Sequence, residues 1–305
     1  MKTRIEEHKN FGKTLFIEHG DITLGVTVDI GPRVIYMSYK GCENLFYEDT
    51  ERRTQKNDQT YRDKFGNDSA WYLYGGHRIW MSPEEYPATY DADNNPVDYT
   101  VDGETVTFTQ KAHTGSTITA TLKLVFENGG ITVYNTIKNV TDKTINGAVW
   151  ALSVMAPGGV GFVKLNDKDT GLLSNKKLVL WPYTKLTDKR LYLFDKYLAV
   201  KQDAAAGCDF KIATDNDSGV IHYYKDGTLF TKEFDIEKGA EYPDCGVYCE
   251  FFTGNYFFEL ESLSALHDIP ANSELTHVER WSLSECGNLT EITEKNIENL
   301  LKITK

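Results

Sequence analysis

The chain has 305 residues, of which 40% are hydrophobic and 26% charged, a composition typical of globular proteins and unlike that of disordered or fibrous chains. Its formal net charge of −12, without a basic stripe, argues against nucleic acid as a partner because a polyphosphate backbone would be repelled. The polar start lacks a secretory signal and no apolar run is long enough to span a bilayer, so we expect a cytoplasmic protein without membrane association.

Hydrophobic residues alternate with a period of two along much of the chain, which predicts β-strands with one buried face. A strand over 22–30 ends at Gly31-Pro32, and another follows over 33–39. Three pairs of alternating segments flank short turns rich in glycine. These turns predict hairpins at Asp102-Gly103, at 128–130 and at Asp226-Gly227.

The rest of the chain continues this pattern of short strands and turns. The polar segment 48–67 is expected to be a surface excursion rather than a linker between domains. Further strands are expected around Phe162 and over 149–154, 247–252, 256–261 and 276–283.

One helix is predicted near the end of the chain. Thr293 is expected to be its N-cap, and Ile297, Leu300 and Leu301 lie on one face that can dock on a sheet. Short strands joined by turns, without long amphipathic helices between them, favour an all-β sandwich over βαβ units. We therefore predict an all-β protein with a single domain over residues 1–305.

The cysteines and the absence of known site motifs limit the kinds of functional site that the chain can hold. Five cysteines, an odd number without paired CxxC spacing, predict reduced and mostly buried thiols rather than a disulfide framework. Cys245 and Cys249 are followed by His267 and His277, but their spacing fits no zinc pattern. No nucleophile elbow, Walker loop or dinucleotide fingerprint occurs. We expect no metal site.

The segment YGGHRIW, from Tyr74 to Trp80, concentrates groups that bind ligands. Two glycines allow close approach of the backbone to a ligand, Arg78 can donate a planar fork of hydrogen bonds, and His77 can exchange a proton near neutral pH. Trp80, like Trp71 before it, can stack on the apolar face of a sugar. The alternative is a structural turn with Trp80 in the core, but convergent polar groups beside aromatic rings favour a binding site.

A second candidate is the segment FFELESL over 257–263, in which two carboxylates interrupt an apolar strand. By alternation, Glu259 and Glu261 project from the same face, about 7 Å apart. Burying both in a core is costly without partners, so the floor of a cleft is the cheaper location. There, partial burial and mutual repulsion raise the pKa of one of them and suit it to acid–base work. The alternative is an exposed strand edge paired with lysines.

Two further strands carry weaker candidates. Lys211 lies between apolar residues on a predicted strand, where it either snorkels to the solvent or points into a site. His277, Glu279 and Trp281 share one face of the strand 276–283, with Arg280 on the other. A structural cross-strand salt bridge and a ligand contact are both compatible with this pattern.

Four segments in this order make the chain resemble the galactose mutarotase-like (aldose 1-epimerase) superfamily across most of its length. The resemblance implies a large antiparallel β-supersandwich, to which the sequence adds the short C-terminal helix predicted above, together with an open cleft that binds a small carbohydrate, and no cofactor. The segments are DIGPRVIYMSYKGCENLFYED (29–49), YGGHRIW (74–80), HTGSTITATLKLVFENGGITVYNTIKNVTDK (113–143) and FFELESLSALHDIPANSELTHVERWSL (257–283).

The resemblance also implies roles for single residues. Enzymes of the superfamily open and reclose a pyranose ring, a glutamate taking the anomeric proton and a histidine protonating the ring oxygen. By position the base is Glu261, or Glu259 if the strand is shifted by one pleat. The stretch that holds the family's histidine reads Trp150 to Val154 here and contains none, which leaves His77 as the candidate acid.

The remaining candidates would hold the substrate, namely Arg78, Trp80, Glu259, Lys211 and Arg33. Three functions stay open at this point. The first is a sugar epimerase with a strand glutamate as general base, and the second is a carbohydrate-binding protein that lacks the acid histidine and does not catalyse. The third is a lyase or hydrolase of acidic sugars, in which Arg33, Arg78 and Lys211 would bind a uronate carboxylate.

Overall fold

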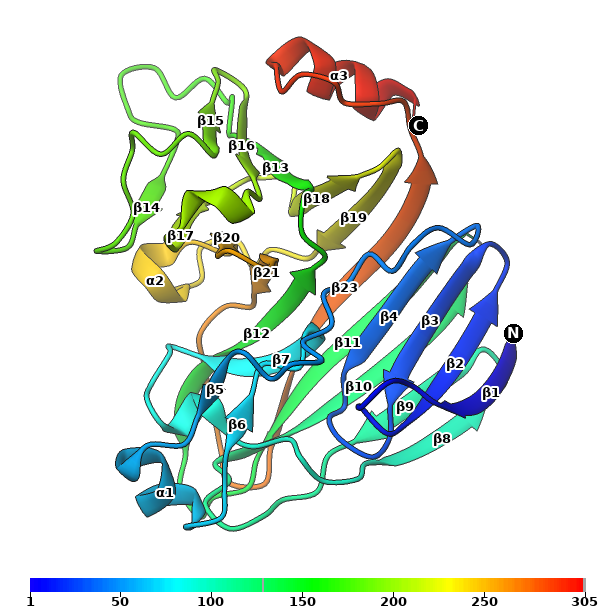
Figure 1. Ribbon diagram of the computed structural model, residues 1–305. Coiled ribbons are helices and arrows are strands. Elements are labelled where there is room, and N and C mark those ends of the chain that lie inside the picture. The colour runs from blue at the N-terminus through cyan, green and yellow to red at the C-terminus, as the bar shows by residue number, and fades with distance from the viewer. Residues whose placement is uncertain (128, 304–305) are drawn as a thin grey trace.

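Two large antiparallel sheets face each other in the computed structural model, which describes residues 1–127 and 129–303 (Figure 1). The first sheet has 11 strands, of which β22 pairs with β12 off the main path. In spatial order they are β1 (Lys2–Glu7), β2 (Lys13–His19), β3 (Ile22–Thr27), β4 (Val34–Tyr39), β7 (Gly76–Ser82), β12 (Ile145–Met155), β21 (Phe258–Leu263), β20 (Cys249–Thr253), β17 (Phe210–Thr214) and β14 (Leu178–Leu180), with β22 (His267–Ile269) beside β12.

The second sheet has 10 strands, and a two-stranded ribbon and short helices complete the described structure. The second sheet runs β15 (Leu191–Leu193), β16 (Tyr197–Lys201), β13 (Val160–Lys164), β18 (Val220–Lys225), β19 (Thr228–Phe234), β23 (Glu274–Glu285), β11 (Gly130–Asn139), β10 (Ile118–Glu127), β9 (Thr105–Thr109) and β8 (Asp98–Asp102). The other elements are β5 (Gln55–Lys56), β6 (Trp71–Tyr72), α1 (Gln59–Phe65), α2 (Pro243–Gly246), α3 (Glu294–Ile303) and the 3₁₀ turns η1 (Ala88–Tyr90) and η2 (Ala204–Ala206).

The predicted all-β sandwich with a C-terminal helix is confirmed. The three predicted hairpins are the pairs β8–β9, β10–β11 and β18–β19, although Asn128 of the second turn lies outside the described residues. Thr293 caps α3 by accepting a hydrogen bond from the backbone N–H of Asn296 at 3.2 Å, and Ile297 and Leu300 are buried against β13, β16, β18 and β19. Among the described residues, no helix has the length and apolar character required to cross a membrane.

Two expectations need correction. The polar segment 48–67 is more than a surface excursion, because it folds helix α1 and buries Tyr61 and Phe65 in the main hydrophobic cluster. The sequence did not indicate that these two aromatic residues are buried, because their neighbours in the chain are charged. The five cysteines are free, as predicted, but only Cys249 is buried, while Cys208 and Cys245 are exposed.

The central strands of the first sheet present two chemically different faces. Arg78 on β7, Glu261 on β21 and Glu250 on β20 lie in one row across the sheet, since Leu152 pairs with both of the first two and Glu261 pairs with Glu250. The adjacent row contains His77 and points the opposite way, because successive side chains on a strand alternate between faces. One face therefore meets the second sheet and the other is directed outward.

A buried polar network lies on the inward face, between the two sheets. Lys232 on β19 forms an ion pair with Glu279 on β23, with 2.6 Å between Nζ and Oε1. The Ser262 hydroxyl donates to Glu279 Oε1 at 2.5 Å and accepts from His277 Nε2 at 2.9 Å, and Trp281 Nε1 donates to Glu279 Oε2 at 2.9 Å. Glu279 is thus supplied with donors on both oxygens.

The energetics of this network follow from complete burial. Burial alone would raise the pKa of Glu279, but Lys232 and the two neighbouring histidines outweigh it and lower this pKa to about 2. Lys232 also donates to the carbonyl oxygens of Ala151 and Leu260, both at 3.3 Å, so its ammonium group ties β19 to β12 and β21. The pair is costly to bury but more costly to break, because a lone charge would remain in the core.

Replacement of Lys232 by Met is expected to lower the free energy of unfolding by about 3–5 kcal/mol, because ionised Glu279 loses its partner. The double variant Lys232→Met/Glu279→Leu removes both charges and should recover most of that loss. Urea denaturation at pH 7 measures both values. The control Lys196→Met breaks the exposed pair with Glu298 and should cost much less, because solvent screens that pair. Equal losses at positions 232 and 196 would contradict the structural role of the network.

Candidate functional site

A cleft of about 340 Å³ opens on the outward face of the first sheet. Its floor comes from β7, β12, β17, β20 and β21, and its rims come from the segments around β5, β6 and η1 on one side and residues 181–183 on the other. Aromatic rings dominate the walls: Trp71, Trp80, Tyr90, Trp150, Trp181, Tyr183, Phe252 and Phe257. The charged side chains in the lining are Lys56, Arg78, Lys211, Glu84, Asp209 and Glu259.

Arg78 and Glu259, two of the predicted substrate-binding residues, form an ion pair on the cleft floor. Arg78 Nη2 donates to Glu259 Oε1 at 3.0 Å, and the guanidinium carbon lies 4.3 Å from the ring centre of Trp80. Burial raises the pKa of Glu259, and the negative charge of Glu261 adds to this, against the opposing effect of Arg78. With 11% of its side chain exposed, Glu259 is the carboxylate of the central strand that a bound ligand can reach.

Lys211 points into the cleft rather than to solvent. Its ammonium nitrogen lies 2.6 Å from Glu250 Oε2 and 3.1 Å from Glu261 Oε2. It also lies 4.7 Å and 4.6 Å from the ring centres of Trp150 and Trp181. Burial would lower the pKa of Lys211, but the two glutamates outweigh it and raise this pKa, so the side chain remains a cation.

Glu261, the predicted base, lies beneath Lys211 and is fully buried. Its Oε2 accepts a hydrogen bond from Trp150 Nε1 at 2.8 Å and pairs with Lys211. Glu250 is also fully buried, and its pKa is raised well above the usual value by burial, with Glu261 acting in the same direction. Sequence reasoning missed Glu250, although a lone carboxylate in the apolar stretch CEFF carries the same signal as FFELESL.

His77 lies on the opposite side of the sheet from the cleft. It is fully buried, its Nε2 donates to Asn135 Oδ1 at 2.8 Å, and its Nδ1 accepts from the Ser153 hydroxyl at 3.0 Å. Burial lowers the pKa of His77 to about 4, so the ring is neutral at physiological pH. The expectation that His77 and Arg78 share one cleft is therefore wrong, because adjacent residues on strand β7 point to opposite faces.

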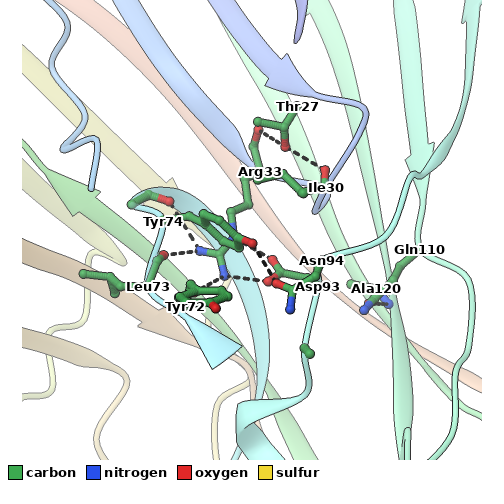
Figure 2. Close-up of polar contacts among 12 residues, drawn as sticks. Thr27, Ile30, Arg33, Tyr72, Leu73, Tyr74, Asp93, Asn94, Gln110 and Ala120 are labelled. Atoms are coloured by element: carbon green, nitrogen blue, oxygen red, sulfur yellow. Dashed lines mark hydrogen bonds and ion pairs between the residues drawn. The ribbon is translucent and has the colours of Figure 1, made fainter. Parts of the chain in front are cut away.

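Arg33 lies beneath the loop that leads into β7 and is 1% exposed (Figure 2). Its guanidinium pairs with Asp93, with 2.5 Å between Nε and Oδ2, and donates to the carbonyl oxygens of Leu73 at 2.7 Å and Gly75 at 3.3 Å. These contacts occupy the side chain in positioning residues 72–75. Arg33 does not contribute to the cleft lining, contrary to its predicted role in substrate binding.

The glycine pair before His77 serves the fold rather than a ligand. Gly75 and Gly76 both have positive φ, and a Cβ on Gly75 would lie 2.0 Å from the carbonyl oxygen of Tyr47. On Gly76 it would lie 2.2 Å from the carbonyl oxygen of Val34. The close approach expected of this pair is therefore to the backbone of the same chain, at Tyr47 and at Val34 of β4, and Arg78 follows Gly76 by two residues on β7.

The other predicted site residues lie either in the cleft on the outward face of the first sheet or in the network between the two sheets. Trp80 and Trp71 line the cleft. Glu279 and His277 belong to the interior network, which is the structural alternative for that strand. Within residues 1–127 and 129–303, no group of three or more His, Cys, Asp or Glu side chains is arranged to hold a metal ion. Trp150 and Trp181 were not predicted, because nothing in the local sequence indicates that they flank Lys211.

Comparison with solved structures shows similarity of fold at low sequence identity. A galactose mutarotase-like protein from Lactobacillus casei matches with a TM-score of 0.57 and 12% identity, over 89% of this chain and 100% of that one. A putative aldose 1-epimerase from Escherichia coli matches with a TM-score of 0.52 and 9% identity, over 93% and 100%. A TPR-domain containing protein from Parabacteroides distasonis matches with a TM-score of 0.59 and 12% identity, over 92% of this chain and 49% of that one.

Comparisons at the level of sequence give no match, neither to a protein-family model nor to a curated protein. The structural likeness nevertheless extends over about nine-tenths of the chain and agrees with the resemblance of its sequence motifs. This protein has the galactose mutarotase-like fold.

Proposed function

We propose that the protein binds a carbohydrate in the cleft and interconverts its anomers, with Glu259 as the proton acceptor. The observation that supports this most directly is the pair formed by Arg78 and Glu259 on a floor walled by tryptophan rings. Indole rings present flat apolar faces that match the C–H face of a pyranose, while the ion pair offers both donors and acceptors to its hydroxyls.

The chemistry assigns different tasks to the charged groups. Glu259 takes the proton of the anomeric hydroxyl while the bond between C1 and the ring oxygen breaks. The ring oxygen takes a proton from water in the open cleft while Arg78 stabilises its developing negative charge, and the hydroxide that remains takes the proton held by Glu259. After rotation about the C1–C2 bond, the same steps in reverse close the ring to the other anomer. A carboxylate whose pKa is raised is a stronger base than a free one, and proton transfer by one positioned group contributes about 10²–10⁴ in rate.

Glu259 takes the role of base in preference to Glu261 because of access. Glu261 is fully buried under Lys211 and bonded to Trp150, whereas Glu259 lines the cleft. Glu259 and Glu261 are two positions apart on β21. This is the shift of one pleat for which the sequence analysis named Glu259 as the alternative base.

A second candidate is sugar binding without catalysis. It is favoured by the position of His77, which the sequence offered as the acid and which lies between the sheets, hydrogen-bonded to Asn135 and Ser153. Under this alternative Glu259 and Arg78 only accept and donate hydrogen bonds to hydroxyls. The two candidates share the ligand and differ in turnover.

Glu259→Gln is expected to reduce the acceleration of mutarotation by at least about 10²-fold, because the amide cannot accept the anomeric proton. Optical rotation of freshly dissolved α-anomers of glucose, galactose, mannose and xylose measures the rate. The control Glu274→Gln changes an exposed carboxylate on β23 and should leave the rate unchanged. Full activity in Glu259→Gln would contradict the role of this residue. A wild-type protein that binds sugar without accelerating its mutarotation would favour the second candidate.

Arg78→Met is expected to weaken sugar binding by about 10- to 100-fold, because a hydrogen bond from a charged donor contributes about 1.5–3 kcal/mol. Titration calorimetry on the same sugars measures the dissociation constant, and thermal unfolding verifies that the variant is folded. The matched control is Arg280→Met, which removes an exposed guanidinium paired with Asp235 and should not alter binding. Unchanged affinity in Arg78→Met would exclude this cleft as the sugar site.

A further inference from the structure

Arg78 is the centre of a compact arrangement at one end of the cleft. Its guanidinium carbon lies 4.3 Å from the ring centre of Trp80 and 5.8 Å from that of Trp71, and the group is paired with Glu259 at 3.0 Å. The combination of a cation, a carboxylate and two indole rings supplies everything that one sugar unit needs, namely a flat apolar wall with donors and acceptors beside it.

Lys211 is the centre of a second arrangement with the same composition. Its ammonium group lies 4.7 Å and 4.6 Å from the rings of Trp150 and Trp181 and is paired with Glu261 at 3.1 Å. Its cation and its accessible ring come from other elements than those of the first centre, because Lys211 is on β17 and Trp181 follows β14, whereas both carboxylates are on β21. The cleft thus holds a second cation between indole rings, where Lys211 and the half-buried Trp181 line the cleft while Glu261 stays fully buried beneath Lys211.

The spacing of the two centres follows from strand geometry. Both cations converge on β21, where Glu259 and Glu261 stand two residues apart on the same face, about 7 Å along the strand. This distance is comparable with the length of one sugar unit in a chain. Two neighbouring units of an oligosaccharide can therefore each meet one centre.

The size of the cleft agrees with a ligand longer than one unit. Its volume of about 340 Å³ falls within the range of about 300–1,000 Å³ that is typical of pockets for ligands of drug size. A disaccharide is closer in size than a single hexose to a ligand of drug size. Besides the floor residues, the cleft is lined by Trp71 and Tyr90 from one part of the chain and by Trp181 and Tyr183 from another.

We propose that the cleft contains two sugar subsites, one at Arg78 and one at Lys211, and that its ligand is a disaccharide or longer oligosaccharide. The inference rests on the proposed carbohydrate binding and specifies the class of sugar. The unit at the Arg78 centre contacts Glu259 and undergoes the anomeric chemistry. The adjacent unit stacks at the Lys211 centre, where Trp181 is the half-buried and accessible ring.

The test is calorimetric titration of the full chain with matched series of saccharides. The probes are glucose, maltose, maltotriose, cellobiose and cellotriose, galactose with β-1,4-galactobiose, and mannose with β-1,4-mannobiose. We expect the dissociation constant to fall at least tenfold from the monosaccharide to the disaccharide in the series that fits. Trp181→Ala should remove this gain and leave the affinity for the monosaccharide unchanged, because only the second subsite is lost.

The control Tyr99→Ala removes an exposed aromatic ring on β8 of the second sheet and should keep the tenfold gain. Equal affinity for monosaccharide and disaccharide in every series would overturn the two-subsite proposal while leaving sugar binding intact. An equal loss of affinity for both ligands in Trp181→Ala would overturn it as well. Absence of binding to any of these saccharides would overturn the proposed function itself, so the two failures are distinguishable. The wild-type comparison decides the question even if Trp181→Ala fails to fold.

Discussion

Adjacent residues on a β-strand point to opposite faces of the sheet, and in this protein that rule separates two systems of buried charge by the thickness of one sheet. The inward system joins Lys232 to Glu279 and ties the two sheets together. The outward system joins Arg78 to Glu259 and Lys211 to Glu261 and forms the floor of the cleft. Strand β7 shows the separation most directly, since His77 belongs to one system and Arg78 to the other.

The two systems differ in how well their charges are balanced. In the interior, Glu279 has donors on both oxygens and a pKa lowered to about 2, despite burial, by Lys232 and the neighbouring histidines. In the cleft, three carboxylates share two cations, and burial raises the pKa of both Glu250 and Glu259. A balanced network stabilises a fold, whereas carboxylates in excess over their cations have raised pKa values of the kind that cluster at functional sites.

The local sequence was sufficient for much of the fold and for part of the site. Alternation and turn residues are local signals, so the hairpins of β8–β9 and β18–β19 and the helix α3 were predicted. The same alternation placed Glu259 and Glu261 on one face. Alternation was not applied to YGGHRIW, whose side chains were expected to serve one site, whereas residues 76–82 form a strand in which His77 and Arg78 point to opposite faces. The partners of Arg33 and Lys211 come from distant segments, and only the tertiary pairing of strands reveals them.

A crystal structure of the protein soaked with galactose or maltose at high concentration tests the central claim most directly, because it shows which face of the first sheet holds the sugar. The arrangement of charges predicts electron density for a sugar ring against Trp80, with a hydroxyl within hydrogen-bond distance of Glu259 and Arg78. A sugar bound elsewhere on the molecule, with the cleft containing only water, would contradict it.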